Sequence, residues 1–234
     1  MEAKRLETVD WGRVEASLTE QGFAQLPQLL SRPECLDLAA LYDRPELFRS
    51  RIDMTRFRFG KGEYQYFNYP LPPLVEELRQ SLYPRLAPVA NRWSELLGSP
   101  DHFPPLLQGL LDECRAKGQN RPTPLILRYG AGDFNCLHQD IYGALAFPFQ
   151  VVCFLSQPGA DYSGGEFLLV ENIPRAQSMG RSLQPEQGDA LIVTTRHRPA
   201  AGKRGPYRVS VRHGVSPVTK GRRLTLGIIF HDAE

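Results

Sequence analysis

The sequence predicts an α+β protein in which an N-terminal helical layer supports a C-terminal β-sandwich or barrel. The length of 234 residues suits one domain with a single large core. Helix-capping signals gather in the first part of the chain. After residue 121 the chain changes to short apolar runs, rich in β-branched and aromatic residues, separated by Gly, Pro and Asn. We therefore expect one domain over residues 1–234, with 1–120 mainly helical and 121–234 forming the β core.

Two helices are expected near the N-terminus. Asp10 can cap a helix over residues 11–21, and Gly22 is placed to end it in a left-handed conformation. An apolar strand, "FAQL", should follow. The stretch "SRPE" at residues 31–34 then has the form of a capping box, and its proline is tolerated in a first turn, so a second helix is expected over residues 33–42.

A third helical pattern covers residues 74–97, in "PLVEELRQSLYPRLAPVANRWSELLG". Proline removes a backbone donor and clashes with the preceding turn. We therefore expect this segment to be interrupted near Pro84 and Pro88.

The stretch between these helices, "TRFRFGKGEYQYFNYPLP", has the two-residue period of a strand. Arg56 and Arg58 alternate with Phe57 and Phe59, which would place cations on one face and aromatic rings on the other. A hairpin packed on the core is the interpretation we favour for residues 56–69. A base-stacking surface is the functional alternative.

Composition and cysteine usage restrict the cellular setting. The chain is 41% hydrophobic and 23% charged, which is ordinary for a globular protein. Neither a signal peptide nor an apolar run of about 18 residues is visible, so we expect a cytoplasmic protein with no membrane partner. The four cysteines form no CxxC pair, which argues for free thiols and against zinc-ribbon and thioredoxin-like sites.

The positive charge is unevenly distributed. Formal net charge is only +2, yet residues 195–223 contain nine Lys or Arg residues and no Asp or Glu. Such a segment attracts anions, including nucleic acid. A solvated basic face is an equally open interpretation.

A candidate metal site lies in "GDFNCLHQDIYG", where His138 and Asp140 stand two residues apart. On a strand both side chains point to one face. A third ligand is needed, and His213 ends the strand pattern "YRVSVRHG" at a turn. Two histidines and one carboxylate leave three positions open for co-substrate and O₂, as in non-haem Fe(II) oxygenases. Hydrolytic zinc is the main chemical competitor.

Other histidines and cysteines have simpler interpretations. His102 and His197 are expected in loops, and His231 falls at the chain end. Cys136 would share the face of His138 on a regular strand, where a small buried thiol is the commoner role. Cys153, within "FQVVCFL", is expected in the core.

An arginine and a tyrosine favour an oxygenase over a hydrolase. Arg223 opens the last strand ten residues after His213, and its forked guanidinium can bind a carboxylate. Tyr129 sits on an earlier strand and could donate its hydroxyl to the same carboxylate. Arg222 is the alternative, although strand alternation points it to the other face. A simple zinc hydrolase needs no anion clamp beside its metal.

With these residues the sequence resembles the Fe(II)/2-oxoglutarate-dependent dioxygenases and their His-x-Asp…His…Arg pattern. "SGGEFLLVE", "PEQGDALIV" and "HGVSPVTKGRR" have the form usual in the prolyl-hydroxylase-like branch, and "QGFAQLPQLLSRPEC" resembles the strand and helix that precede its core. More narrowly, the chain is similar to a bacterial group described as acting oxidatively on damaged, alkylated DNA.

The resemblance implies a double-stranded β-helix, or jelly-roll, core. It implies that His138, Asp140 and His213 bind Fe(II), that Arg223 pairs with the C5 carboxylate of 2-oxoglutarate, and that Tyr129 assists. Oxidative decarboxylation of 2-oxoglutarate with O₂ would then be coupled to hydroxylation or demethylation of a substrate. Alkylated nucleic acid and a protein side chain are the candidate substrates, and a non-catalytic β-barrel binding module is the alternative class. The oligomeric state stays open.

Overall fold

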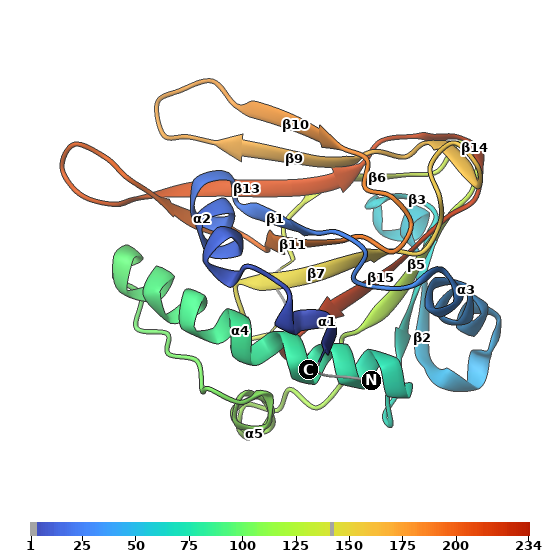
Figure 1. Cartoon of the computed structure of the whole chain (residues 1–234), viewed down its shortest axis with the longest axis horizontal. Coiled ribbons are helices and arrows are strands. Elements are labelled where there is room, and N and C mark those ends of the chain that lie inside the picture. The colour runs from blue at the N-terminus through green and yellow to red at the C-terminus, as the bar shows by residue number, and fades with distance from the viewer. Residues whose placement is uncertain (1–3, 141–142) are drawn as a thin grey trace.

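The computed structural model describes residues 4–140 and 143–234, which form two antiparallel sheets packed face to face, with helices over the outer face of the larger sheet (Figure 1). This architecture confirms the expected jelly roll with a helical layer. The helices are α1 (Lys4–Glu7), α2 (Trp11–Gln21), α3 (Arg32–Ala40), α4 (Pro73–Leu97) and α5 (Leu107–Ala116), with 3-10 turns at Leu41–Asp43, Pro45–Leu47 and Met54–Phe57.

The larger sheet has the strand order β1-β11-β7-β15-β5-β4-β2. Its strands are β1 (Phe23–Leu26), β2 (Phe48–Asp53), β4 (Glu63–Phe67), β5 (Leu125–Tyr129), β7 (Phe149–Phe154), β11 (Ala190–Thr194) and β15 (Arg223–Ile229). The order interleaves early and late strands, so segments from both ends of the chain build one surface. The first 120 residues are thus less purely helical than expected, because three of these strands come from them.

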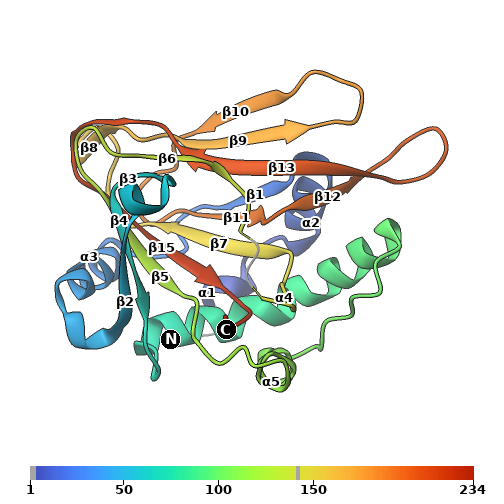
Figure 2. The ribbon, with the colours of Figure 1, turned by 180° about the vertical axis from the view of Figure 1, so that it is seen from behind.

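The smaller sheet has the order β10-β9-β13-β6-β3, and β12 also pairs with β13. Its strands are β3 (Gly60–Lys61), β6 (Phe134–His138), β9 (Phe167–Asn172), β10 (Met179–Leu183), β12 (His197–Ala200) and β13 (Tyr207–Val215), and a separate pair is formed by β8 (Tyr162–Gly164) and β14 (Val218–Gly221). The β9–β10 and β12–β13 hairpins extend past the sandwich at one end (Figure 2).

The helix ends follow the capping chemistry read from the sequence. The Asp10 side chain accepts a hydrogen bond from the Arg13 amide, and Gly22 ends α2 with φ of 75°. At the start of α3, Ser31 and Glu34 form both halves of a capping box. The first two expected helices are therefore confirmed to within two residues at each end.

Helix α4 differs from the expectation because it continues through both prolines as one 25-residue helix. Pro88 is exposed and Pro84 half-buried, four residues apart on the same side of the helix. Carbonyl groups that lose an amide partner there can be hydrated by water. The prolines therefore do not interrupt the helix. Helix α5 was not anticipated.

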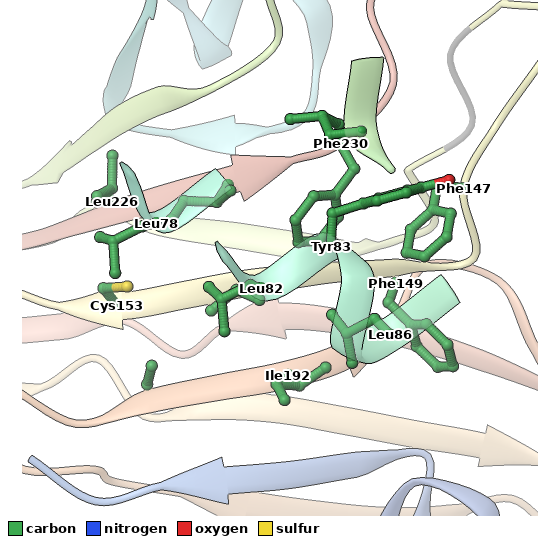
Figure 3. Close-up of a cluster of buried hydrophobic side chains, with 14 of the residues drawn as sticks. Leu78, Leu82, Tyr83, Leu86, Phe147, Phe149, Cys153, Ile192, Leu226 and Phe230 are labelled. Carbon is green, nitrogen blue, oxygen red and sulfur yellow. The ribbon is translucent and has the colours of Figure 1, made fainter. Parts of the chain in front are cut away.

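The opposite side of α4 builds the main core against the larger sheet. Leu78, Leu82 and Leu86 point from α4 toward the sheet, where Cys153 and Ile192 meet them (Figure 3). Each of these side chains is nearly inaccessible to solvent. The expectation that Cys153 belongs to the core is confirmed. Burial of this apolar surface holds α4 against the outer face of the larger sheet.

A second apolar cluster fills the space between the two sheets. Val152 and Phe154 from β7 meet Phe167 and Leu169 from β9, with Val211 from β13. Alternate residues of β7 therefore serve two different cores, which explains why the whole strand is buried.

The stretch "TRFRFGKG" does not form the expected alternating strand. Met54–Phe57 is a 3-10 turn in which the Asp53 carboxylate accepts from the Thr55 amide. Arg58 follows with a left-handed φ of 58°. This local turn chemistry overrides the period-two pattern, and Phe57 and Phe59 lie on the same side, stacked on each other.

A buried ion pair anchors the basic segment to the N-terminal helical layer. Arg198 on β12 donates to both carboxylate oxygens of Glu171 on β9, and its Nη1 donates to the Thr19 carbonyl of α2. Both charged side chains are almost fully buried. Arg198 is therefore a structural residue, unlike its exposed neighbours in the sequence.

Candidate metal centre

His138, Asp140 and His213 converge between the two sheets. His138 and His213 are direct register partners on β6 and β13, with ring centroids 4.3 Å apart. The Asp140 carboxylate lies 3.3 Å from Nε2 of His138 and 3.1 Å from Nε2 of His213. One ligand atom from each residue lies within 4.8 Å of the others. The structure thus brings together all three residues that the sequence singled out.

Close approach of β6 and β13 makes this convergence possible. The register shifts between His213 and Val215, which marks a bulge beside the site. A Cβ atom on Gly214 would lie only 2.7 Å from the Asn135 carbonyl oxygen. Glycine at this position therefore lets the two histidine-bearing strands pack together.

The charges of the cluster suit a metal ligand set. Burial alone would raise the pKa of Asp140, but His213 and His138 outweigh it and hold that pKa well below its usual value. Burial lowers the pKa of His213. Burial would lower the pKa of His138, but its contacts with Asp140 raise it. Asp140 is therefore an anion and His213 favours its neutral form, as metal binding requires, and a metal would displace any proton from Nε2 of His138.

The hydrogen bonds orient two of the three side chains toward a shared point. Nδ1 of His138 donates to the Cys136 carbonyl at 2.8 Å, which turns Nε2 toward Asp140 and makes it the nitrogen that a metal would bind. The Gln150 amide donates to Asp140 at 2.7 Å and lies 3.1 Å from Nε2 of His213. Two histidines and one carboxylate in this arrangement fit a facial metal site with open positions.

Gln150 was missed by sequence reasoning. It is a buried amide inside the otherwise apolar strand "FQVVCF". An isolated polar residue in a fully buried strand requires a hydrogen-bond partner, and that signal could have identified it. The partner itself is visible only once β7 is placed beside the metal ligands.

Arg223 and Tyr129 lie across the same cavity, on the larger sheet. They are register partners at one end of the β5–β15 pair, and both are almost completely buried. Among the described residues, Nε and Nη2 of Arg223 have no hydrogen-bond partner. Burial raises the pKa of Tyr129 to about 12, so its hydroxyl is a proton donor. Arg222 is exposed outside the cavity.

The cavity that joins these groups has a volume of about 340 Å³. His138, His213 and Arg223 line it, and Tyr64 and Tyr66 from β4 form an aromatic wall. The two tyrosine rings meet edge to face, 5.4 Å apart. Both tyrosines fall within residues 56–69, where the sequence predicted a hairpin, but they were not predicted to lie at the site. The volume is that of a pocket for small molecules or one substrate group.

The remaining histidines and the nearby cysteine lie outside the cluster. His102 is in an exposed loop, and His197 is half-buried on β12 rather than in the expected loop. His231 is buried, and its Nδ1 accepts from the Phe147 amide. Cys136 is exposed, contrary to the buried role expected for it, because β6 leaves that side chain at the cavity mouth.

The basic segment 195–223 divides into buried and exposed residues. Arg198 and Arg223 are buried, as described above, and the other seven cations are exposed. Five of them lie on what we call the basic arm, residues 196–212, which comprises β12, β13 and their turn: Arg196, Lys203, Arg204, Arg208 and Arg212. In the part of the chain that the structure describes, no helix has the length and apolar character to cross a membrane.

Gln139 connects the arm to the metal ligands. It stands between His138 and Asp140, and its side-chain amide donates to the Arg196 and Val211 carbonyls, both at 2.9 Å. The segment that carries His138 and Asp140 is therefore fixed directly to the base of the arm.

Comparison with known proteins gives one family. Residues 62–233 match the Oxygenase-NA family model, described as "Oxygenase, catalysing oxidative methylation of damaged DNA". Two uncharacterized proteins of Mycobacterium tuberculosis, from strains CDC 1551 / Oshkosh and H37Rv, are each 50% identical over 167 residues, which is 71% of this chain and 72% of theirs.

Solved structures with low sequence identity share the fold. A prolyl-4-hydroxylase from Pseudomonas putida has a TM-score of 0.58 and 16% identity, covering 95% of this chain and 100% of that one. A 2OG-Fe(II) oxygenase family oxidoreductase from Burkholderia pseudomallei has a TM-score of 0.56 and 17% identity, covering 97% and 93%. The likenesses confirm the jelly-roll fold expected from the sequence.

Proposed function

Because the chain belongs to this oxygenase family, we propose that it uses Fe(II), 2-oxoglutarate and O₂ to oxidise alkylated nucleic acid, with residues 1–234 acting as one domain. His138, Asp140 and His213 would hold the metal, and Arg223 with Tyr129 would hold the distal carboxylate of 2-oxoglutarate. Membership of an oxygenase family favours this chemistry over zinc hydrolysis and over a non-catalytic binding module.

One observation carries the proposal most directly. A single cavity contains a His-Asp-His cluster and a buried guanidinium with two nitrogens that have no partner among the described residues. Buried N–H groups of a cation that lack acceptors are costly. A dicarboxylic acid that binds a metal at one end and an arginine at the other would satisfy both features at once.

The residues of the cavity have separable tasks. When bound, Fe(II) and 2-oxoglutarate supply the activation of O₂, with one oxygen atom leaving in succinate and the other entering the substrate. Asp140 stays anionic, and Gln150 fixes its orientation through the 2.7 Å hydrogen bond. Arg223 donates N–H groups to a carboxylate in a site closed to water, where such bonds are strong. The rings of Tyr64 and Tyr66 line the cavity and offer aromatic faces to a planar base.

The basic arm supports a nucleic-acid substrate. Its five exposed cations have no acidic residue in the same segment to oppose them. Phosphate contacts release counterions, so the affinity would fall steeply with salt. For single strands each lost contact lowers the slope of log K against log salt by about 0.7.

The test is a coupled turnover assay. Anaerobic Fe(II) and 2-oxoglutarate are loaded, O₂ is added, and succinate is measured alone, with a short alkylated single-stranded DNA, and with proline-containing peptides. Stimulation by the alkylated DNA, with formaldehyde released from an N-methyl group, supports the proposal. Stimulation by a peptide with a gain of one oxygen would instead identify a protein hydroxylase, and no succinate under any condition would reject the oxygenase assignment of this cavity.

The contribution of the arm is tested separately by Lys203→Ala/Arg204→Ala. We expect weaker DNA binding and a salt slope reduced by about 1.4, from two contacts of about 0.7 each. Lys117→Ala, an exposed lysine after α5, is the matched control. An unchanged slope in the double variant would show that the arm does not contact the phosphates.

A further inference from the structure

Two phenylalanine rings lie exposed beside the mouth of the cavity. Phe57 is 54% and Phe59 46% exposed, and the rings stack on each other with centroids 5.4 Å apart and an interplanar angle of 18°. Phe59 and its neighbour Arg58 line the same cavity as His138. Large exposed aromatic groups at a binding site usually mark a contact surface. We call these two rings the Phe pair.

The turn that carries the Phe pair is held firmly. The Phe59 amide donates to the Met54 carbonyl, and Met54 is completely buried beneath it. The Cys136 amide of β6 donates to the Phe59 carbonyl at 2.8 Å, and β3 continues this pairing at Gly60. The turn lies against β6 at the end of the sandwich opposite the loop of the β12–β13 hairpin (Figure 2). The rings are therefore presented by a rigid support that also carries the metal ligand His138.

Cations surround the rings. Arg56, Arg58 and Lys61 all lie within four residues of the pair, and Arg56 and Lys61 are well exposed. Asp53 and Asp133 lie beside Arg56 and Lys61 at 4.0 and 3.4 Å, leaving Arg58 as an additional positive charge. An aromatic face with a positive rim complements a nucleobase attached to a phosphate backbone.

We propose that the Phe pair is a stacking platform for an unpaired base adjacent to the nucleotide that enters the cavity. This inference rests on the proposed function and adds a substrate form to it, because a base can stack on an outside ring only after it has left its duplex neighbours. Single-stranded or locally opened nucleic acid is the occupant. A fully paired duplex would reach the basic arm but not the Phe pair.

The experiment compares Phe57→Ala, Phe59→Ala and the double variant with Phe57→Tyr/Phe59→Tyr, which keeps both rings. Leu96→Ala, a 47% exposed residue on α4, is the control for losing an exposed apolar side chain. The probes are a single-stranded oligonucleotide containing 2-aminopurine next to an alkylated base, and its blunt duplex. Binding is followed by anisotropy, and base stacking by quenching of the 2-aminopurine fluorescence.

We expect each alanine variant to bind the single strand about 5- to 150-fold more weakly, the range of one lost base stack, and to lose the quenching. The tyrosine variant should restore both, and duplex affinity should change less than twofold. The platform is rejected if the double alanine variant binds and quenches like the wild type, or if duplex and single strand weaken equally. Absence of any single-strand binding by the wild type at low salt would reject the nucleic-acid substrate as well. If the wild type binds the single strand and the alanine variants bind and quench equally well, only the platform is rejected.

Discussion

Replacement of Arg223 by methionine should weaken the binding of 2-oxoglutarate and, at the same time, raise the stability of the ligand-free protein. Arg223 is 1% exposed, and two of its guanidinium nitrogens have no partner among the described residues. Methionine has a similar length and no charge. The change therefore removes the donors for a bound carboxylate, and it also removes a buried charge that is only partly compensated by Tyr162 and the Tyr129 and Phe154 rings in the ligand-free protein.

The size of both effects follows from this environment. Two charge-assisted hydrogen bonds are worth about 1.5–3 kcal/mol each, so the affinity for 2-oxoglutarate should fall roughly 150- to 25,000-fold. Exchange of a buried charge for an apolar group often stabilises a protein by about 1–4 kcal/mol. For a chain of this length each kcal/mol raises Tm by about 2–4 °C. The ligand-free variant should thus melt at a higher temperature than the wild type.

The assay is anaerobic thermal unfolding with Mn²⁺, with and without 2-oxoglutarate. At about 100 times Kd the ligand adds about 2.7 kcal/mol to the wild type, or about 5–10 °C. It should add at most about 0.3 kcal/mol, or about 1 °C, to Arg223→Met at the same concentration. Arg222→Met is the matched control, because this exposed neighbour should leave both quantities unchanged. A ligand shift retained by Arg223→Met but lost by Arg222→Met would refute the assignment of the clamp.

Three further changes examine the site and its support. Gln150→Leu removes the donor to Asp140 and should weaken Mn²⁺ binding about 10- to 100-fold. Burial chiefly lowers the pKa of His231 to about 4, so the unfolded chain takes up this proton first as pH falls below about 6.5. The free energy of unfolding is therefore not reduced by His231 above that pH, and up to about 3 kcal/mol of it is lost as the pH falls toward 4. His231→Gln should flatten the pH dependence of urea unfolding. Arg198→Met leaves Glu171 buried and unpaired and should cost about 3–5 kcal/mol of unfolding free energy, which Glu171→Gln in the same chain should largely restore.

Each of these three predictions would be contradicted by a specific result. Unchanged Mn²⁺ affinity in Gln150→Leu would mean that Asp140 needs no support from β7. Equal pH slopes for wild type and His231→Gln would show that other groups dominate acid unfolding. If the added Glu171→Gln change restores nothing, the cost of Arg198→Met comes from lost packing rather than from the unpaired charge.

Local chemistry explains which parts of the fold could be predicted. The start and end of α2 depend on Asp10 and Gly22 alone, so the sequence contains all the necessary information. The continuity of α4 depends on which side of the helix faces water, and this is decided by packing on the sheet. The turn at 54–57 was misread because the Asp53 hydrogen bond and the left-handed Arg58 have no periodic signature.

The same distinction applies to the site. His138 and Asp140 were predictable as a pair from their spacing, although β6 ends at His138 and Asp140 lies just beyond it, and His213 because it lies near the end of a strong strand pattern. Gln150 and the tyrosines of β4 could not be assigned, since their position depends on the order of strands in the larger sheet. Residues 141–142, which directly follow Asp140, lie outside the described residues.

The hydrogen bonds of Gln139 connect the metal site to the basic arm, so that metal affinity and DNA affinity are expected to be thermodynamically coupled. Its amide holds the backbone of the arm at Arg196 and Val211, while its own backbone separates two metal ligands. If DNA on the arm changes metal affinity by some factor, metal must change DNA affinity by the same factor. We expect Gln139→Ala to reduce that factor toward one, which paired titrations of Mn²⁺ and DNA would measure. Metal binding would then change the DNA affinity of a surface some 20 Å away, and no domain would have to move. This distance corresponds to six residues along β13 at about 3.3 Å each.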